Sequence, residues 1–177
     1  MEMDKKTWKK ILFLDIDGVL SSVDFLMKNN RNGFIDKEKI ALLNQLKPYD
    51  VEVVISSSWG YNEDTVNTLK SCGLELPIIG GIDHFYSDWI CRGNEIAKWL
   101  INTFDNYSLF TGKPYIYENY KGDDYEYVIL DDDEDMLMCQ KDNFIHVDRN
   151  TALTEETIIK IIDILERKNL KINYEAL

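Results

Sequence analysis

The segment Ile11–Leu20 reads ILFLDIDGVL, an apolar run that ends in two aspartates and a glycine. Its first four residues are apolar without interruption, which is typical of a β-strand buried on both faces. Asp15 and Asp17 follow directly, and Gly18 allows the chain to turn sharply after them. Because side chains alternate along an extended chain, residues two apart can reach one ligand from the same side. The segment therefore predicts a buried strand that ends in a pair of cooperating aspartates.

Short, mostly apolar runs recur along the chain, at Val51–Ile55, Leu76–Ile79, Tyr127–Leu130 and Phe144–Val147. Stretches with apolar residues at helical spacing lie between and after them, at Asp36–Leu46, Asn62–Lys70, Asn94–Phe104 and beyond Thr154. We expect Pro48 to stop the first of these helices. Buried strands separated by amphipathic helices predict an α/β fold, a three-layer sandwich around a mostly parallel, Rossmann-like sheet.

The composition fits one cytoplasmic domain and argues against several other classes of protein. The chain has 177 residues, of which 45% are hydrophobic and 29% charged, as in ordinary globular domains. No apolar run approaches the roughly 18–20 residues of a membrane span, and the charged N-terminus does not resemble a secretory signal. Three scattered cysteines without a CxxC motif suit a reducing cytosol. The net charge of −12 disfavours strong nonspecific binding to nucleic acid or to an anionic membrane.

Side chains that can carry chemistry also follow the other apolar runs. Three serines come after the second run, two aspartates come after the fourth, and a cation precedes the third helix: Ser56, Ser57, Ser58, Asp131, Asp132 and Arg92. Roughly one strand and one helix separate each group from the next. Because the carboxyl ends of parallel strands lie at one edge of a sheet, we expect these groups to meet the first aspartate pair there.

Carboxylates gathered at one edge would repel each other unless a cation lay among them. Oxygen ligands favour Mg²⁺, and nearby hydroxyl and guanidinium groups suit a phosphoryl group. An aspartate beside Mg²⁺ can also act as a nucleophile and form an aspartyl-phosphate. The residues thus predict a Mg²⁺-assisted phosphoryl-transfer site.

The sequence ILFLDIDGVL resembles the first motif of the haloacid dehalogenase (HAD) superfamily of phosphohydrolases, an apolar strand followed by DxDGT or DxDGV. The later features agree in order over about Lys10 to Leu165: a serine after the second strand, a cation opening a helix and an acidic pair after a third strand. The segments ISSSWG, RGNEIAKWL and YVILDDDEDM are also similar to the small HAD domains of RNA-repair proteins.

This resemblance implies that Asp15 is the nucleophile that attacks phosphorus. It implies that Asp17 protonates the leaving oxygen and then activates water. Ser57 would hydrogen-bond the phosphoryl oxygens, but three consecutive serines leave the register open, so Ser56 is an alternative. The neighbouring Ser58 and Gly18 would also border the substrate.

The resemblance further implies that Mg²⁺ is held by the Asp15 carboxylate, the backbone carbonyl of Asp17 and either Asp131 or Asp132. The sequence does not choose between those two adjacent acids. Arg92 stands where the family most often has a lysine. Arginine keeps the positive charge but presents it as a planar fork of donors, so the geometry of this contact must differ.

Residues 1–177 are interpreted as a single HAD-like domain with a minimal cap, in which 18–50 form a small flap plus a helix and 107–125 a surface loop. The sequence therefore predicts a Mg²⁺-dependent phosphomonoester hydrolase with an open site for a nucleotide, a nucleic-acid end or another phosphoester. Aromatic side chains available for stacking are Trp59, Tyr107, Tyr115, Tyr117 and Tyr120. The alternative is a HAD-like module that binds Mg²⁺ and phosphate with little turnover. A two-component receiver domain fits less well, because its acidic pair would lie on the first strand and its phosphoacceptor on a later one. The oligomeric state is not determined by these patterns.

Overall fold

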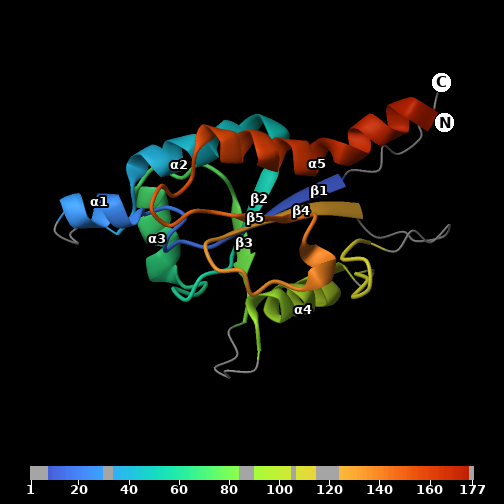
Figure 1. Ribbon diagram of the computed structural model, residues 1–177, viewed down its shortest axis with the longest axis horizontal. Coiled ribbons are helices and arrows are strands. Elements are labelled where there is room, and N and C mark those ends of the chain that lie inside the picture. Colours follow the sequence, from blue (N-terminus) through green and yellow to red (C-terminus); the bar gives the residue numbers. More distant parts are fainter. Residues whose placement is uncertain (1–7, 30–33, 84–89, 105–106, 115–123, 176–177) are drawn as a thin grey trace.

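The computed structural model describes residues 8–29, 34–83, 90–104, 107–114 and 124–175, with side chains up to residue 167. Within these ranges, five parallel strands form one sheet: β1 (Trp8–Leu14), β2 (Val51–Ile55), β3 (Ile78–Gly81), β4 (Asp124–Asp131) and β5 (Phe144–His146). Their order is β3-β2-β1-β4-β5, so the first strand lies at the centre and the strand order reverses beside it (Figure 1). The predicted α/β fold with a parallel, Rossmann-like sheet is confirmed.

Helices cover both faces of the sheet, as the uniformly apolar strands require. The helices α2 (Lys37–Leu43) and α5 (Glu155–Glu175) lie on one side of the sheet and α4 (Arg92–Phe104) lies on the other (Figure 1). The other helices of the described residues are α1 (Val23–Lys28), α3 (Glu63–Ser71) and two 3₁₀ helices, η1 (Asn44–Tyr49) and η2 (Met138–Gln140).

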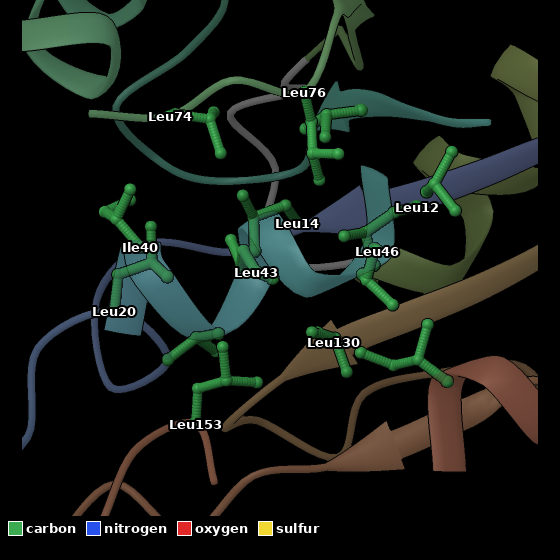
Figure 2. Packing of buried hydrophobic residues seen from close by; sticks show 14 of the residues in the cluster. Leu12, Leu14, Leu20, Ile40, Leu43, Leu46, Leu74, Leu76, Leu130 and Leu153 are labelled. Atoms are coloured by element: carbon green, nitrogen blue, oxygen red, sulfur yellow. The ribbon is translucent and has the colours of Figure 1, made fainter. Parts of the chain in front are cut away.

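The alternation of side chains along β1 divides the core into two parts. Leu12 and Leu14 pack into one cluster with residues of α2, η1 and α5, and Figure 2 shows them facing Leu43 and Leu46. Ile11 and Phe13 point to the opposite face and pack into a second cluster with α4. All four residues are fully buried, so the apolar half of ILFLDIDGVL anchors the centre of the sandwich.

The helix expected over Asp36–Leu46 differs from the prediction in how it ends. The α-helix begins after its N-cap Asp36 and stops at Leu43, and the chain then continues as η1, which contains Pro48. Proline cannot donate to the carbonyl four residues before it, and its ring clashes with that carbonyl in an α-helix. The α-helix therefore ends before Pro48, but the chain continues through this proline as a 3₁₀ helix to Tyr49.

The two segments singled out at 18–50 and 107–125 also differ from expectation. Within 18–50 the part expected as a small flap contains the short helix α1, and residues 30–33 lie outside the described ranges. Within 107–125, Tyr107 is only 5% exposed and Tyr125 belongs to β4, so neither lies on a surface loop. Both tyrosines pack into the cluster beneath α4. Residues 115–123, including Tyr115, Tyr117 and Tyr120, fall outside the described ranges.

Within the described ranges, no helix combines the length and the apolar character that crossing a bilayer requires.

Candidate functional site

The site lies where β1, β2 and β4 end, at the reversal of strand order where open α/β sheets bind ligands. The N–H of Asp15 donates to the carbonyl of Leu130 at 3.0 Å, and the N–H of Ser56 donates to the carbonyl of Leu14 at 2.8 Å. The backbone ladder therefore continues one residue past β1 and β2. As a result, the first aspartate, the first serine and Asp131 of β4 are level with one another across three neighbouring strands.

Three carboxylates meet at this edge. Asp15, Asp131 and Asp132 each offer an oxygen, and these oxygens lie within 4.8 Å of one another. Burial raises the pKa of Asp15 to about 8, with a further contribution from the negative charge of Asp131. Burial also raises the pKa of Asp131 to about 6. In the absence of a cation, the surroundings of both carboxyl groups therefore disfavour the ionised form.

The two oxygens of Asp131 have different environments. Oδ1 accepts a hydrogen bond from the N–H of Asp133 at 2.9 Å. Oδ2 is buried without a hydrogen-bond partner in the described part of the chain, although the Nε atom of Arg92 lies 3.7 Å away. A buried carboxylate oxygen in this situation is suited to a metal ligand, and an all-oxygen donor set matches a hard cation such as Mg²⁺.

Asp132 is fixed from two sides. Its Oδ2 atom lies 3.0 Å from Nη2 of Arg149, which also contacts Asp133 at 3.2 Å. On the other side is Gly18, which has a φ of +74°, and a Cβ atom added there would lie 2.2 Å from the same Oδ2 atom. Burial raises the pKa of Asp132, and the charge of Arg149 opposes that shift. The turn after β1 and the loop after β5 therefore enclose this carboxylate.

The three serines have separate environments. The Ser57 hydroxyl is fully buried and donates a hydrogen bond to the Asp15 carboxylate, which lowers the pKa of that carboxyl against the effect of burial. Ser56 is also fully buried, and its Oγ atom has no hydrogen-bond partner among the described residues. Ser58 is exposed. Of the three, the structure therefore brings the hydroxyl of Ser57 against the first aspartate.

Asp17 lies outside the group of three carboxylates. It is exposed, and its Oδ2 atom accepts a hydrogen bond from the indole Nε1–H of Trp59 at 2.9 Å. The backbone of Asp17 also forms an isolated bridge with Ser21. The two aspartates of the DxD pair consequently face different surroundings, one buried among carboxylates and one open to solvent beside an indole.

Arg92 is the first residue of α4 and is brought to the site, as expected. Its backbone N–H donates to Oδ2 of Asp135 at 2.8 Å. Its guanidinium lies 3.7 Å from Asp131 and 3.5 Å from the buried Glu95. The cation therefore contacts an acidic side chain of the cluster and an acid of its own helix.

Sequence reasoning did not assign roles to Arg149, Glu95 or Asp135. Arg149 follows β5 at the same edge of the sheet, so the rule that located the other groups could also have selected it. Glu95 lies one turn after Arg92 on α4, a spacing that favours an ion pair. No local pattern indicates that Asp135 reaches the start of α4.

A parallel sheet with β1 at its centre, and acidic side chains at the carboxyl ends of its strands, are the features of a HAD-like domain. The comparison with protein families agrees: residues 11–158 match the model of the HAD domain in Swiss Army Knife RNA repair proteins. This match covers most of the chain, and the protein belongs to that family. Neither the curated proteins nor the solved structures gave a match.

Proposed function

We propose that this protein is a Mg²⁺-dependent phosphomonoester hydrolase that works through an aspartyl-phosphate on Asp15. The observation that carries the proposal is the convergence of three carboxylates, one of which, Asp131, has a buried oxygen without a hydrogen-bond partner among the described residues. The Ser57 hydroxyl donates to the first of them, Asp15. Family membership supports the same chemistry, because the matched range, residues 11–158, includes all the residues to which the resemblance assigns roles.

The proposed metal ligands are Asp15, Asp131 and Asp132, together with the backbone carbonyl of Asp17 by resemblance to the superfamily. When bound, Mg²⁺ would offset the charge of the carboxylates and polarise a phosphoryl oxygen. Arg149 offsets part of the charge on Asp132 from outside the cluster. Arg92 does the same for Asp131 and would stand in for the lysine of the family.

The reaction would proceed in two displacements. In the first, a carboxylate oxygen of Asp15 forms a bond to phosphorus while the bond from phosphorus to the ester oxygen breaks. Asp17 gives its proton to that oxygen, so the alcohol departs neutral. In the second, water attacks phosphorus and gives a proton to Asp17, and the bond between phosphorus and Asp15 breaks. Inorganic phosphate leaves, and both aspartates return to their starting states.

Ser57 would hold the Asp15 carboxylate in the orientation for attack and then donate to a phosphoryl oxygen. Its complete burial fixes the hydroxyl at the end of β2. Ser56 is oriented differently, because its hydroxyl is buried without contacting the carboxylate cluster in any described hydrogen bond. We therefore assign the hydroxyl role to Ser57.

The proposed substrate class is a phosphorylated nucleotide or nucleic-acid end. The family to which the chain belongs is described from RNA repair proteins, which favours this class. The net charge of −12 means that contacts to a long phosphate backbone would supply little of the affinity. Recognition would instead depend on the phosphate itself and the nucleotide that carries it.

The test is phosphate release from a panel of phosphoesters in Mg²⁺ and in EDTA. The panel contains p-nitrophenyl phosphate, nucleoside monophosphates and oligonucleotides phosphorylated at either end. We expect turnover that requires Mg²⁺ and disappears in D15N, because an amide is a poor nucleophile and a poor ligand. The matched control is D163N, which changes an exposed aspartate on α5 and should leave turnover unchanged. Binding of Mg²⁺ without turnover of any member of the panel would contradict the hydrolase and support the binding module.

A further inference from the structure

We propose that Phe34 and Trp59 form an aromatic wall that receives the base of a nucleotide substrate, and that the Trp59 indole also positions Asp17. This inference rests on the proposed function and specifies its substrate: the alcohol that leaves would be a nucleoside or a terminal nucleotide. "Aromatic wall" denotes these two side chains throughout.

The first step is the location of the wall relative to the reaction. The Nε1–H of Trp59 donates to Oδ2 of Asp17 at 2.9 Å, so the indole touches the residue that would protonate the leaving oxygen. The ring of Phe34 lies 6.1 Å from that of Trp59, centroid to centroid, at an interplanar angle of 77°. The pair of rings therefore lies beside the residue that would protonate the departing alcohol.

The second step is that hydrogen bonds anchor the backbone at both aromatic residues. The Ser21 hydroxyl donates to the carbonyl of Phe34, and Ser21 itself forms a bridge with Asp17. The carbonyl of Trp59 accepts hydrogen bonds from Nδ2 of Asn62 at 2.9 Å and from Oγ1 of Thr65 at 3.2 Å. The backbone of Phe34 is thus bonded to the turn that carries Asp17, and the backbone of Trp59 is bonded to the start of α3.

The third step is the exposure of Phe34, whose side chain contributes little to the core. The residue is 62% exposed, although its neighbour Ile35 is buried. An edge-to-face pair of this kind leaves a π-face available, and nucleobases stack on such faces whatever their sequence. Because the acidic surface disfavours backbone contacts, stacking of the terminal base is the attraction that this site can offer.

The fourth step concerns the second role of Trp59. A hydrogen bond to one oxygen of Asp17 fixes the carboxylate plane and leaves the other oxygen to exchange a proton with the leaving group or with water. Trp59 would therefore be a positioning residue for Asp17 as well as part of the wall. The variant W59F keeps an aromatic ring but removes the N–H donor, so it separates these two roles.

The experiment on the wall compares AMP with ribose 5-phosphate, which have the same phosphate and sugar and differ by the base. We expect the ratio of kcat/KM for AMP over ribose 5-phosphate to fall in F34A by about 5-fold to 100-fold, the usual range for loss of one base–aromatic stack. The loss should lie mainly in KM. The control is F110A, which removes a phenyl group that is 92% exposed on another loop and should keep the wild-type ratio. An unchanged ratio in F34A would overturn the wall.

A binding measurement separates failure of this inference from failure of the proposed function. Adenosine carries no phosphate, so its binding, followed by NMR titration, needs neither turnover nor Mg²⁺. The wild type and F110A should bind adenosine more tightly than F34A does, by a factor similar to the expected fall in the kcat/KM ratio. Equal binding by all three proteins would overturn the wall even if the protein is an active phosphatase. Weaker binding by F34A would support it even if no phosphoester is hydrolysed.

The positioning role is tested by the dependence on the leaving group. W59F should lower kcat/KM, which reports the first displacement alone, by about 10-fold for AMP, whose alcohol needs a proton, and by much less for p-nitrophenyl phosphate, whose phenolate leaves readily. A residue that only supported the fold would lower both values equally. Equal losses on the two substrates would therefore overturn the positioning role of Trp59.

Discussion

At Gly18 the backbone conformation and the room left for a site carboxylate both require glycine. Its φ of +74° lies in the left-handed region, and an added Cβ atom would lie 2.2 Å from Oδ2 of Asp132. We expect G18A to displace Asp132, to weaken Mg²⁺ binding at least 10-fold and to abolish most of the turnover. Calorimetric titration with Mg²⁺ measures the first effect directly.

The control for this variant is G73A. Gly73 also has a positive φ, of +100°, but no atom of the described residues lies within 4 Å of the Cβ atom that alanine would add. Both variants should lose about 1–2 kcal/mol of stability from the left-handed backbone, measured by urea unfolding. Only G18A should lose Mg²⁺ affinity. Equal affinities in the two variants would mean that Asp132 is not a ligand.

Asp17 gives a second prediction at this scale, which follows from its placement outside the carboxylate cluster. We expect D17N to keep Mg²⁺ binding, since its carboxylate is not among the three that converge. Turnover of an alkyl phosphate should fall by roughly 10²–10⁴-fold, the usual contribution of a general acid–base. Formation of the intermediate from p-nitrophenyl phosphate should fall far less. Burst and steady-state rates on both substrates measure the two displacements separately, and small, equal losses would exclude Asp17 from the mechanism.

Among the elements, α4 brings Arg92 to the site, and the start of α4 is held by a segment distant in sequence, around Leu137–Gln140. Its second residue, Gly93, packs so closely on the chain before η2 that an added Cβ atom would lie 2.4 Å from the backbone N of Leu137. Gln140 links the two segments, because its Nε2 donates to the carbonyl of Gly93 and its Oε1 accepts from the N–H of Leu137, both at 3.0 Å. Since Arg92 opens this helix, the same contact sets where its guanidinium meets Asp131.

We therefore expect G93A to push the start of α4 away from the segment around Leu137. Overpacking of this kind costs about 1–3 kcal/mol of stability, and the shift of Arg92 should lower turnover beyond what the remaining folded fraction explains. Urea unfolding and activity per folded molecule measure the two effects. N94A, at the next and exposed position of the helix, should change neither. A G93A protein of normal stability would show that α4 is not packed as described.

For the elements, the sequence predicts the features that depend on local pattern, namely the strands and the residues that follow them. The run Val51–Ile55 matches β2 at both ends, and the rule that strand ends share one edge brings Asp15, Ser57 and Asp131 together correctly. The predictions fail where tertiary contacts determine the surroundings of a residue. Asp135 accepts a hydrogen bond from the backbone N–H of Arg92, which lies 43 positions away in sequence, and no pattern in either segment predicts that contact. Tyr107 is buried for the same reason, since the cluster beneath α4 forms only when the sheet assembles.

For the whole molecule, the buried carboxylates make stability depend on pH in a direction opposite to that of ordinary ion-paired acids. Without metal, the pKa of Asp15 is raised to about 8 and that of Asp131 to about 6, from an ordinary value of 3.8. The folded state therefore binds these protons more tightly than the unfolded state does. Their contribution to stability is complete below about pH 4 and is lost as pH rises through about 6 and then about 8.

Mg²⁺ should reverse this loss, because it binds the ionised carboxylates and competes with the protons. In EDTA we expect the melting temperature to fall as the pH is raised from about 5 to about 8.5. Saturating Mg²⁺ should restore it most at the alkaline end, by a free energy of about 2.7 kcal/mol at a hundred times the dissociation constant. NaCl at equal ionic strength controls for screening of the net charge of −12, and should restore much less. D15N removes the carboxyl with the largest shift, so its melting temperature in EDTA should vary less with pH. A wild-type protein whose melting temperature responds equally to Mg²⁺ and to matched NaCl at every pH would have no metal site at this edge of the sheet.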